Sequence, residues 1–285
     1  MTDRSDKETD MSTVTSADGT TIAYETHGTG PALIIVDGAL CHREMGPSRD
    51  VAKELADRFT VYCYDRRGRG GSGDTPDYSV DRETDDLAAL IEAAGGSAHV
   101  VGFSSGAALA LAAAQRGLPI TRLATYEAPF IVDGTRPPIP ASTPADLRDL
   151  VQAGKRGAAV KRFLKLVGTP AVFVAIMPLI PVWKKLTGVA HTLPYDLSIV
   201  TPNQAGHPLP AGTYAGIKAP TLVLDGGKSP QWIRTAQSAI ADSIAGAEYR
   251  TLPGQTHMVK AKVLAPELAA HFAETTSARR TPRAK

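Results

Sequence analysis

The residues with the clearest chemical potential form the segment Gly102-Phe103-Ser104-Ser105-Gly106. The apolar run 98–103 predicts a buried strand, and the alanine-rich stretch 105–117 predicts a helix. A serine between a strand and a helix sits on a sharp turn that exposes its hydroxyl, and small neighbours let that turn close. The helix N-terminus favours negative charge near the reacting oxygen. Ser104 is therefore the candidate nucleophile; the alternative is a tight strand–helix turn without chemistry.

A serine hydroxyl needs a base to take its proton before it can attack a carbon atom. His257 is the candidate, because it lies in Gly254-Gln255-Thr256-His257, directly after the last predicted strand. A lone histidine is more often structural than catalytic, so its position in the chain carries the argument. The other histidines lie in a helix, beside early strands or in loops: His27, His42, His99, His191, His207 and His271.

The elements that would position these two residues alternate between short apolar runs and helical patterns. This alternation predicts an α/β fold in which helices cover both faces of a mostly parallel, eight-stranded sheet. The predicted strands are 12–16, 20–26, 32–36, 59–64, 98–103, 120–126, 221–224 and 248–252, and the predicted helices are 80–94, 105–117, 232–244 and 265–272.

The alternation stops between residues 131 and 216, where prolines separate several helix-like pieces. We therefore predict a core built from residues 12–130 and 217–274, with a helical lid, residues 131–216, inserted after the sixth strand. Residues 1–11 and 275–285 are polar and lack an apolar anchor, which predicts disordered tails.

The predicted lid holds more apolar side chains than a few short helices can bury among themselves. Most of them would pack onto the core, and we expect some to face a pocket for a mainly apolar substrate. They are Phe163, Leu164, Leu166, Val167, Phe173, Ile176, Met177, Leu179, Ile180 and Trp183.

Composition excludes little but favours an ordinary water-exposed surface. The chain has 31 basic and 29 acidic residues, and this balance gives no reason to expect nucleic acid or an anionic membrane as a partner. The longest apolar run, 169–183, is interrupted by prolines and is shorter than the ~20 residues that span a bilayer. The first ten residues lack the apolar stretch of a secretory signal. Cys41 and Cys63 have no metal-ligand spacing. We expect a cytoplasmic protein with reduced thiols and no metal or other cofactor; its oligomeric state stays open.

One further motif is typical of a different class of protein, those that bind dinucleotides. Gly68-Arg69-Gly70-Gly71-Ser72-Gly73 matches the Gly-x-Gly-x-x-Gly pattern of dinucleotide-binding proteins. That fingerprint also needs a helix that starts at once and an acid at the end of the next strand. Here Pro76 follows, and Asp85 and Asp86 fall inside a predicted helix, so these glycines indicate a turn rather than a nucleotide site.

From about residue 12 to 272 the chain resembles the α/β-hydrolase superfamily. The resemblance rests on the segments Ile35-Val36-Asp37-Gly38, Asp65-Arg66-Arg67-Gly68-Arg69-Gly70, Gly102 to Gly106 and Gly254 to His257. More narrowly, the chain is similar to bacterial hydrolases of unassigned substrate that carry a Tyr-Glu-Pro/Ala-Pro segment after the helix that follows the nucleophile. The resemblance implies an α/β-hydrolase fold in which Ser104 is the nucleophile and His257 the general base.

The third member of the catalytic triad departs from the family pattern. Many members place an aspartate in a Gly-x-x-Asp-Pro context, where this chain reads Gly226-Gly227-Lys228-Ser229-Pro230. We predict that Glu127, which ends the sixth strand, orients His257 and stabilises its imidazolium. Some haloalkane dehalogenases, similar in fold, take their acid from that strand end. Asp225 is the alternative, followed by Asp133 or no acid at all; each carboxylate could instead cap nearby N–H groups.

The resemblance also implies an oxyanion hole, which needs backbone N–H donors. We expect them from Ser105 and from Ala39, because Gly38 lets the chain turn close to the site. Family members usually have His-Gly where this chain has Asp37-Gly38. An anion there would oppose a developing oxyanion unless it is paired, and Arg66 or Arg67 is the expected partner of Asp37.

These features together predict a carboxylesterase-like serine hydrolase that cleaves an ester, a lactone or a similar acyl bond of an apolar small molecule. A serine at position 104 argues against dehalogenase or epoxide hydrolase chemistry, which uses aspartate. Two alternatives remain: a lyase or acyltransferase on the same fold, and an inert relative that only binds a ligand.

Overall fold

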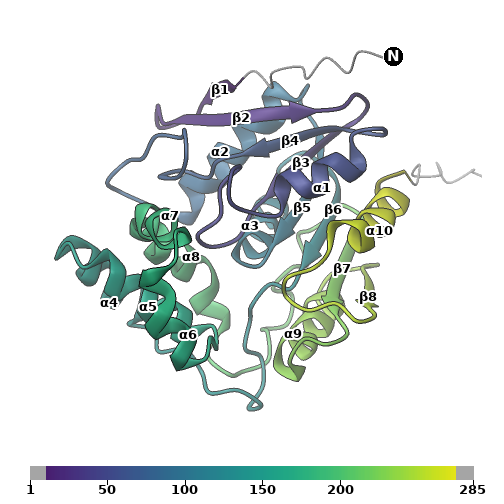
Figure 1. The fold of residues 1–285 in the computed structure, drawn as a ribbon. Coiled ribbons are helices and arrows are strands. Elements are labelled where there is room, and N and C mark those ends of the chain that lie inside the picture. Colours follow the sequence, from purple (N-terminus) through teal and green to yellow (C-terminus); the bar gives the residue numbers. More distant parts are fainter. Residues whose placement is uncertain (1–10, 274–285) are drawn as a thin grey trace, which may run out of the picture.

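The computed structural model describes residues 11–273 (Figure 1). Residues 1–10 and 274–285 lie outside the described residues, so both predicted tails fall almost wholly outside them.

An eight-stranded sheet forms the centre of the molecule, in the order β1-β2-β4-β3-β5-β6-β7-β8. Neighbouring strands from β4 to β8 are parallel, whereas β2 is antiparallel to both β1 and β4. The prediction of a mostly parallel eight-stranded sheet is therefore confirmed. The strands are β1 (Ser12–Thr15), β2 (Thr21–His27), β3 (Ala32–Val36), β4 (Thr60–Tyr64), β5 (Ala98–Phe103), β6 (Ile120–Tyr126), β7 (Thr221–Gly226) and β8 (Glu248–Leu252).

Helices cover both faces of this sheet, because successive side chains of a buried strand point to opposite sides. In β3, Leu33 and Ile35 pack with α1 (Ser48–Leu55) and α10 (Ala261–Ala273). Ile34 and Val36 belong to the core on the other face, which α2 (Val80–Ala93), α3 (Ser105–Gln115) and α9 (Gln231–Asp242) cover. The sequence analysis missed α1, which is short and buries only Ser48, Val51, Ala52 and Leu55.

The remaining helices all lie between β6 and β7, within residues 131–216, and gather at one side of the sheet (Figure 1). They are α4 (Thr143–Gln152), α5 (Arg156–Leu166), α6 (Ala171–Ile176), α7 (Val182–Gly188) and α8 (Leu193–Val200), with short 3-10 turns η1 (Met177–Leu179), η2 (Ala190–Thr192) and η3 (Thr201–Asn203). Leu193 and Leu197 of α8 belong to the same core as α3. The inserted helices are thus docked on the core through α8; their function as a lid stays a prediction.

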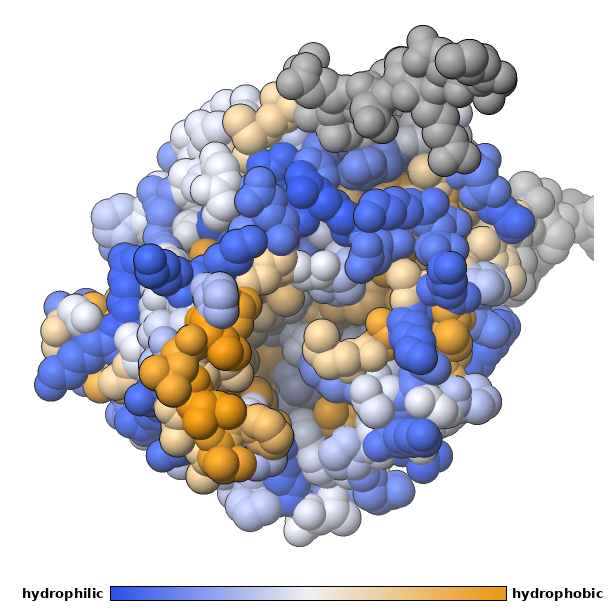
Figure 2. Space-filling view, in the orientation of Figure 1, coloured by the Kyte–Doolittle hydropathy of each residue, from blue (hydrophilic) through white to orange (hydrophobic). Residues whose placement is uncertain are grey.

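Of the ten apolar side chains predicted in this insertion, Met177 is half-buried and the other nine divide into two groups. Phe163, Leu164, Leu166 and Trp183 pack against the core. Val167, Phe173, Ile176, Leu179 and Ile180 are exposed to water. Figure 2 shows apolar side chains over these helices, beside a hollow in this face of the molecule.

Candidate active site

Ser104 sits on a strained turn between β5 and α3. Its backbone has φ 54° and ψ −123°, a conformation that costs energy for a residue with a side chain. Two glycines make the turn possible: a Cβ at Gly102 would lie 2.4 Å from the carbonyl oxygen of Gly106, and one at Gly106 would lie 2.2 Å from that of Val36. The Ser104 amide donates to the Tyr126 carbonyl at 2.9 Å, which ties the turn to the end of β6.

The loop after β3 passes directly over this serine. A Cβ at Gly38 would lie 2.9 Å from the Cβ of Ser104, so only glycine fits at position 38. Among the described residues, the backbone N–H groups of Ala39 and Ser105 have no hydrogen-bond acceptor. Free N–H groups next to a serine are the donors that an oxyanion hole requires.

His257 is paired with Glu127. The imidazole Nδ1 lies 2.7 Å from Glu127 Oε2, and the carboxylate is completely buried whereas the histidine side chain is 41% exposed. Glu127 follows β6 with a left-handed backbone, φ 51°. Its second oxygen accepts hydrogen bonds from the Gly226 amide at 2.7 Å and the Ser229 hydroxyl at 2.5 Å. This pairing sets the orientation and tautomer of the imidazole through Nδ1, and it leaves Nε2 available for another partner.

The histidine loop is held by the neighbouring strand ends. The Tyr126 hydroxyl donates to the Thr256 carbonyl at 2.6 Å. A Cβ at Gly226 would lie 2.5 Å from the Gln255 carbonyl oxygen, so the backbones touch at this point. The hydrogen bond and the glycine contact position His257 from the ends of β6 and β7.

Asp225, the alternative acid, has different partners. It is completely buried, accepts a hydrogen bond from the Tyr249 hydroxyl and lies 3.8 Å from Arg234 Nε. Ser229, which stands where many family members carry the acid, is instead a donor to Glu127. The geometry therefore brings Glu127, and not Asp225, to His257.

The expected pairing of Asp37 with Arg66 or Arg67 is wrong. Both Asp37 carboxylate oxygens are buried without a hydrogen-bond partner in the described part of the chain. Arg66 binds the backbone carbonyl of Asp37 at 3.2 Å, and Arg67 pairs with Asp86 and Asp18. Burial raises the pKa of Asp37 to about 7, against the opposing effect of nearby Arg69 and Arg66 charges. Below that pH Asp37 is mostly protonated, which reduces the conflict with an oxyanion nearby.

A buried ionic cluster supports the same loops. Asp196 of α8 binds Arg66 Nη1 at 2.7 Å and Arg69 Nη2 at 2.6 Å, and all three side chains are about 1% exposed. Its Oδ1 also accepts from the Ser105 hydroxyl at 2.7 Å. Glu83 of α2 neutralises the other side of Arg66 at 2.5 Å. The inserted segment thus contributes a charge directly beneath the start of α3.

The two arginines also form hydrogen bonds to the loop after β3. Arg66 donates to the Asp37 carbonyl at 3.2 Å, and Arg69 donates to the Gly38 carbonyl at 2.7 Å. The Gly38 carbonyl belongs to the same peptide unit as the free Ala39 amide, and the Asp37 carbonyl belongs to the preceding unit. The sequence analysis did not identify Arg69 or Asp196, because their contact joins segments 127 residues apart.

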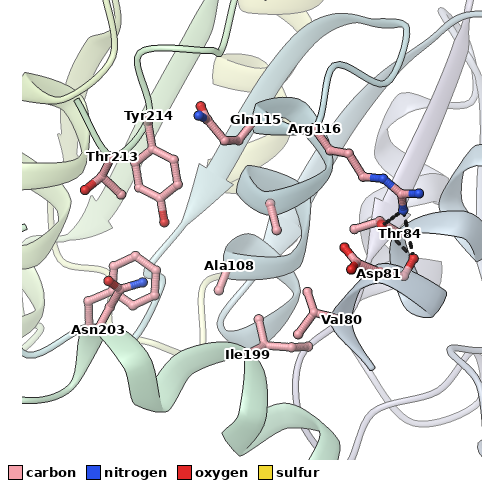
Figure 3. A pocket seen from close by; sticks show the side chains of 12 residues that line it. Val80, Asp81, Thr84, Ala108, Gln115, Arg116, Ile199, Asn203, Thr213 and Tyr214 are labelled. Atoms are coloured by element: carbon pink, nitrogen blue, oxygen red, sulfur yellow. Dashed lines mark hydrogen bonds between the residues drawn. The ribbon is translucent and has the colours of Figure 1, made fainter. Parts of the chain in front are cut away.

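Two other features lie away from these residues. A cavity of about 360 Å³ runs along α3 between α2 and the end of α8, lined among others by Ala108, Ile199 and Tyr214 (Figure 3). None of the predicted site residues lines it.

Glu25, His27 and Cys63 bring potential metal-ligand atoms within 4.8 Å of one another. However, Arg49 and Arg43 bind the Glu25 carboxylate, and two guanidinium groups oppose a cation there.

Comparison with known proteins identifies relatives of this arrangement. The model of the alpha/beta hydrolase family matches residues 26–267. An alpha/beta hydrolase of known structure from Sphaerobacter thermophilus is 50% identical, with a TM-score of 0.84 that covers 92% of this chain and all of the other. An enol-lactonase from Burkholderia xenovorans is 20% identical with a TM-score of 0.67, over 93% of this chain and all of the other, which shows a shared fold.

Sequence comparison with curated proteins covers less of the chain. N-formylmaleamate deformylase from Pseudomonas putida is 37% identical over 116 residues, which are 38% of this chain and 41% of the deformylase. An uncharacterized hydrolase, YraK, from Bacillus subtilis is 34% identical over 97 residues, 33% of this chain and 35% of that protein. The chain therefore spans about two fifths or less of the curated relatives that it matches.

The raised pKa of the buried Asp37 predicts how the free energy of unfolding changes with pH. Its pKa is about 7 in the folded protein and near 3.8 when exposed, so the folded state binds more protons between these values. The free energy of unfolding should therefore fall as pH rises from about 4 to 7, by up to about 4 kcal/mol from this group. In Asp37→Asn this contribution disappears, and the variant should gain stability relative to wild type across that range. Urea unfolding at several pH values measures the difference; parallel curves for the two proteins would contradict the assignment.

The ionic cluster makes a second prediction. Asp196→Ala leaves two buried guanidinium groups without their shared carboxylate and should lower the free energy of unfolding by about 3–5 kcal/mol. Asp146→Ala is the matched control, because Asp146 pairs with Arg162 at a solvent-exposed site and should cost at most about 1 kcal/mol. Thermal and urea unfolding of both variants tests this, and equal losses would contradict it.

Proposed function

Since this chain belongs to the alpha/beta hydrolase family, we propose that it is a hydrolase that cleaves an acyl bond through a covalent ester on Ser104. The observation that carries the proposal is the pairing of His257 Nδ1 with the buried carboxylate of Glu127. A carboxylate on one ring nitrogen makes the other nitrogen a base for a serine hydroxyl. The strained turn at Ser104 and the free N–H groups beside it supply the rest of such a site.

The proposed reaction has two halves. His257 takes the proton of Ser104, whose oxygen attacks the acyl carbon while the Ala39 and Ser105 N–H groups stabilise the oxyanion. The bond to the leaving group breaks, and His257 donates its proton to that group. A water molecule then loses a proton to His257 and attacks the ester, which releases a carboxylic acid and restores the serine. Glu127 stabilises the imidazolium in both halves.

We propose an ester, a lactone or a similar acyl bond of a mainly apolar small molecule as the substrate. Relatives named as a deformylase and an enol-lactonase support acyl chemistry on this scaffold. The apolar side chains beside the hollow in Figure 2 support an apolar substrate.

A fluorophosphonate probe tests the nucleophile. The probe should label the wild-type protein covalently, with one adduct that peptide mass spectrometry assigns to Ser104, because only an activated serine attacks phosphorus at a useful rate. Ser104→Ala should abolish labelling, and Ser97→Ala, which removes an exposed hydroxyl just before β5, should leave it unchanged. Persistent labelling in Ser104→Ala would refute the assignment, and an unlabelled wild type would favour an inert ligand-binding relative.

Turnover of a short soluble ester distinguishes the two candidate acids. Glu127→Gln should reduce kcat about a thousandfold or more, because the neutral amide no longer stabilises the imidazolium. Asp225→Asn should retain most of the activity, since Asp225 contacts Tyr249 and Arg234 instead. The reverse result would transfer the role to Asp225.

Product analysis with and without an added alcohol separates hydrolysis from acyl transfer.

A further inference from the structure

The inserted helices expose an unusual amount of apolar surface. Of the eleven large hydrophobic side chains identified as exposed in the described residues, seven lie between positions 167 and 182. Leu179 is 83% exposed and Phe173 54%. We call these seven residues the apolar patch: Val167, Val172, Phe173, Ile176, Leu179, Ile180 and Val182. Such concentrations on a protein surface are typical of contact with another molecule or a membrane.

The same segment is strongly basic. Residues 150–195 contain seven of the 31 lysines and arginines of the chain and not one of its 29 acids. Arg162 pairs with Asp146, and Arg156 donates to the Gly188 carbonyl. No ion pair is found for the lysines of this segment within the described part of the chain. They are Lys155, Lys161, Lys165, Lys184 and Lys185.

We propose that α5, α6 and α7 form a docking surface for an anionic phospholipid bilayer. Apolar side chains of the patch would enter the boundary between headgroups and acyl chains, while the lysines of residues 150–195 contact lipid phosphates. Peripheral helices use this combination at membrane surfaces. This inference goes beyond the hydrolase activity and does not depend on it. It replaces the expectation, drawn from the balanced charge of the whole chain, that no membrane is a partner.

The helices would lie on the bilayer rather than cross it. In the described residues no single helix has the length and apolarity needed to span a membrane. The stretches Ala171–Leu179 and Val182–Gly188 reach that threshold only together, and they are bent by 98° relative to each other. Such a bent pair of short helices suits contact with a membrane surface better than a straight crossing.

A second copy of this chain is a weaker candidate for the same surface. In a symmetric dimer each basic segment would face its own copy, and like charges at close range oppose association. An anionic bilayer is complementary to both properties of the surface.

Vesicle flotation tests the proposal. The full chain should float with vesicles of equimolar phosphatidylcholine and phosphatidylglycerol, bind phosphatidylcholine vesicles far less, and dissociate as salt screens the charges. Lys184→Glu/Lys185→Glu should weaken binding about thirtyfold or more, since each basic residue contributes about fivefold. Phe173→Ser/Leu179→Ser should weaken it about tenfold or more through lost apolar contact.

Matched controls separate the surface from general charge and hydrophobicity. Lys53→Glu/Lys262→Glu makes the same charge change on α1 and α10, and Val263→Ser removes an exposed apolar side chain from α10; both should bind like wild type. The lysine variant and both control variants should hydrolyse a soluble ester as wild type does. No flotation of the wild type, equal loss in the controls, or a dimer in light scattering that the patch variants abolish would each overturn the proposal.

Discussion

The contact between Asp196 and the two arginines Arg66 and Arg69 joins the inserted helices to the start of α3 and to the loop after β3. Its three side chains come from a helix of the insertion and from the loop after β4, and they meet out of contact with water. Buried charges of this kind are stable only when every partner is present. The arginines also donate to the carbonyls of residues 37 and 38, so the docked insertion supports the loop that covers Ser104.

The parallel sheet explains why residues far apart in sequence meet. Residues 37–39, Ser104 and Glu127 all follow the carboxyl ends of parallel strands, which lie at one edge of the sheet. Strand order reverses between β3 and β5, where such sheets leave room for a ligand. In the described residues, the non-glycine residues with a positive φ are Leu40, Ser104 and Glu127, and all three lie at this edge. The strained backbone is therefore concentrated at the candidate site.

Much of this fold could be predicted from the sequence, since it depends on local patterns. Four strands have the predicted bounds, because turn residues on both sides of an apolar, β-branched run define where the strand begins and ends. Helix α1 could not be found, because its eight residues are largely polar and it is identified only by packing against α10.

The site was predictable only in part. The positions of Ser104 and Glu127 follow from strand ends, and the structure brings Glu127 to His257. The partners of Asp37 could not be predicted, because a long arginine side chain can reach several acceptors and sequence proximity does not choose among them. Arg66 and Arg67 reach Glu83, Asp196 and Asp86 instead, which leaves Asp37 buried with a raised pKa.

The hydrogen bond between Ser229 and Glu127 has an evolutionary consequence. An aspartate at position 229 would place a second carboxylate against an oxygen that now accepts two hydrogen bonds. Mutual repulsion would disfavour that intermediate, and so would loss of the acid at position 127 before another had replaced it. Positions 127 and 229 can therefore exchange their roles only by a coupled pair of substitutions.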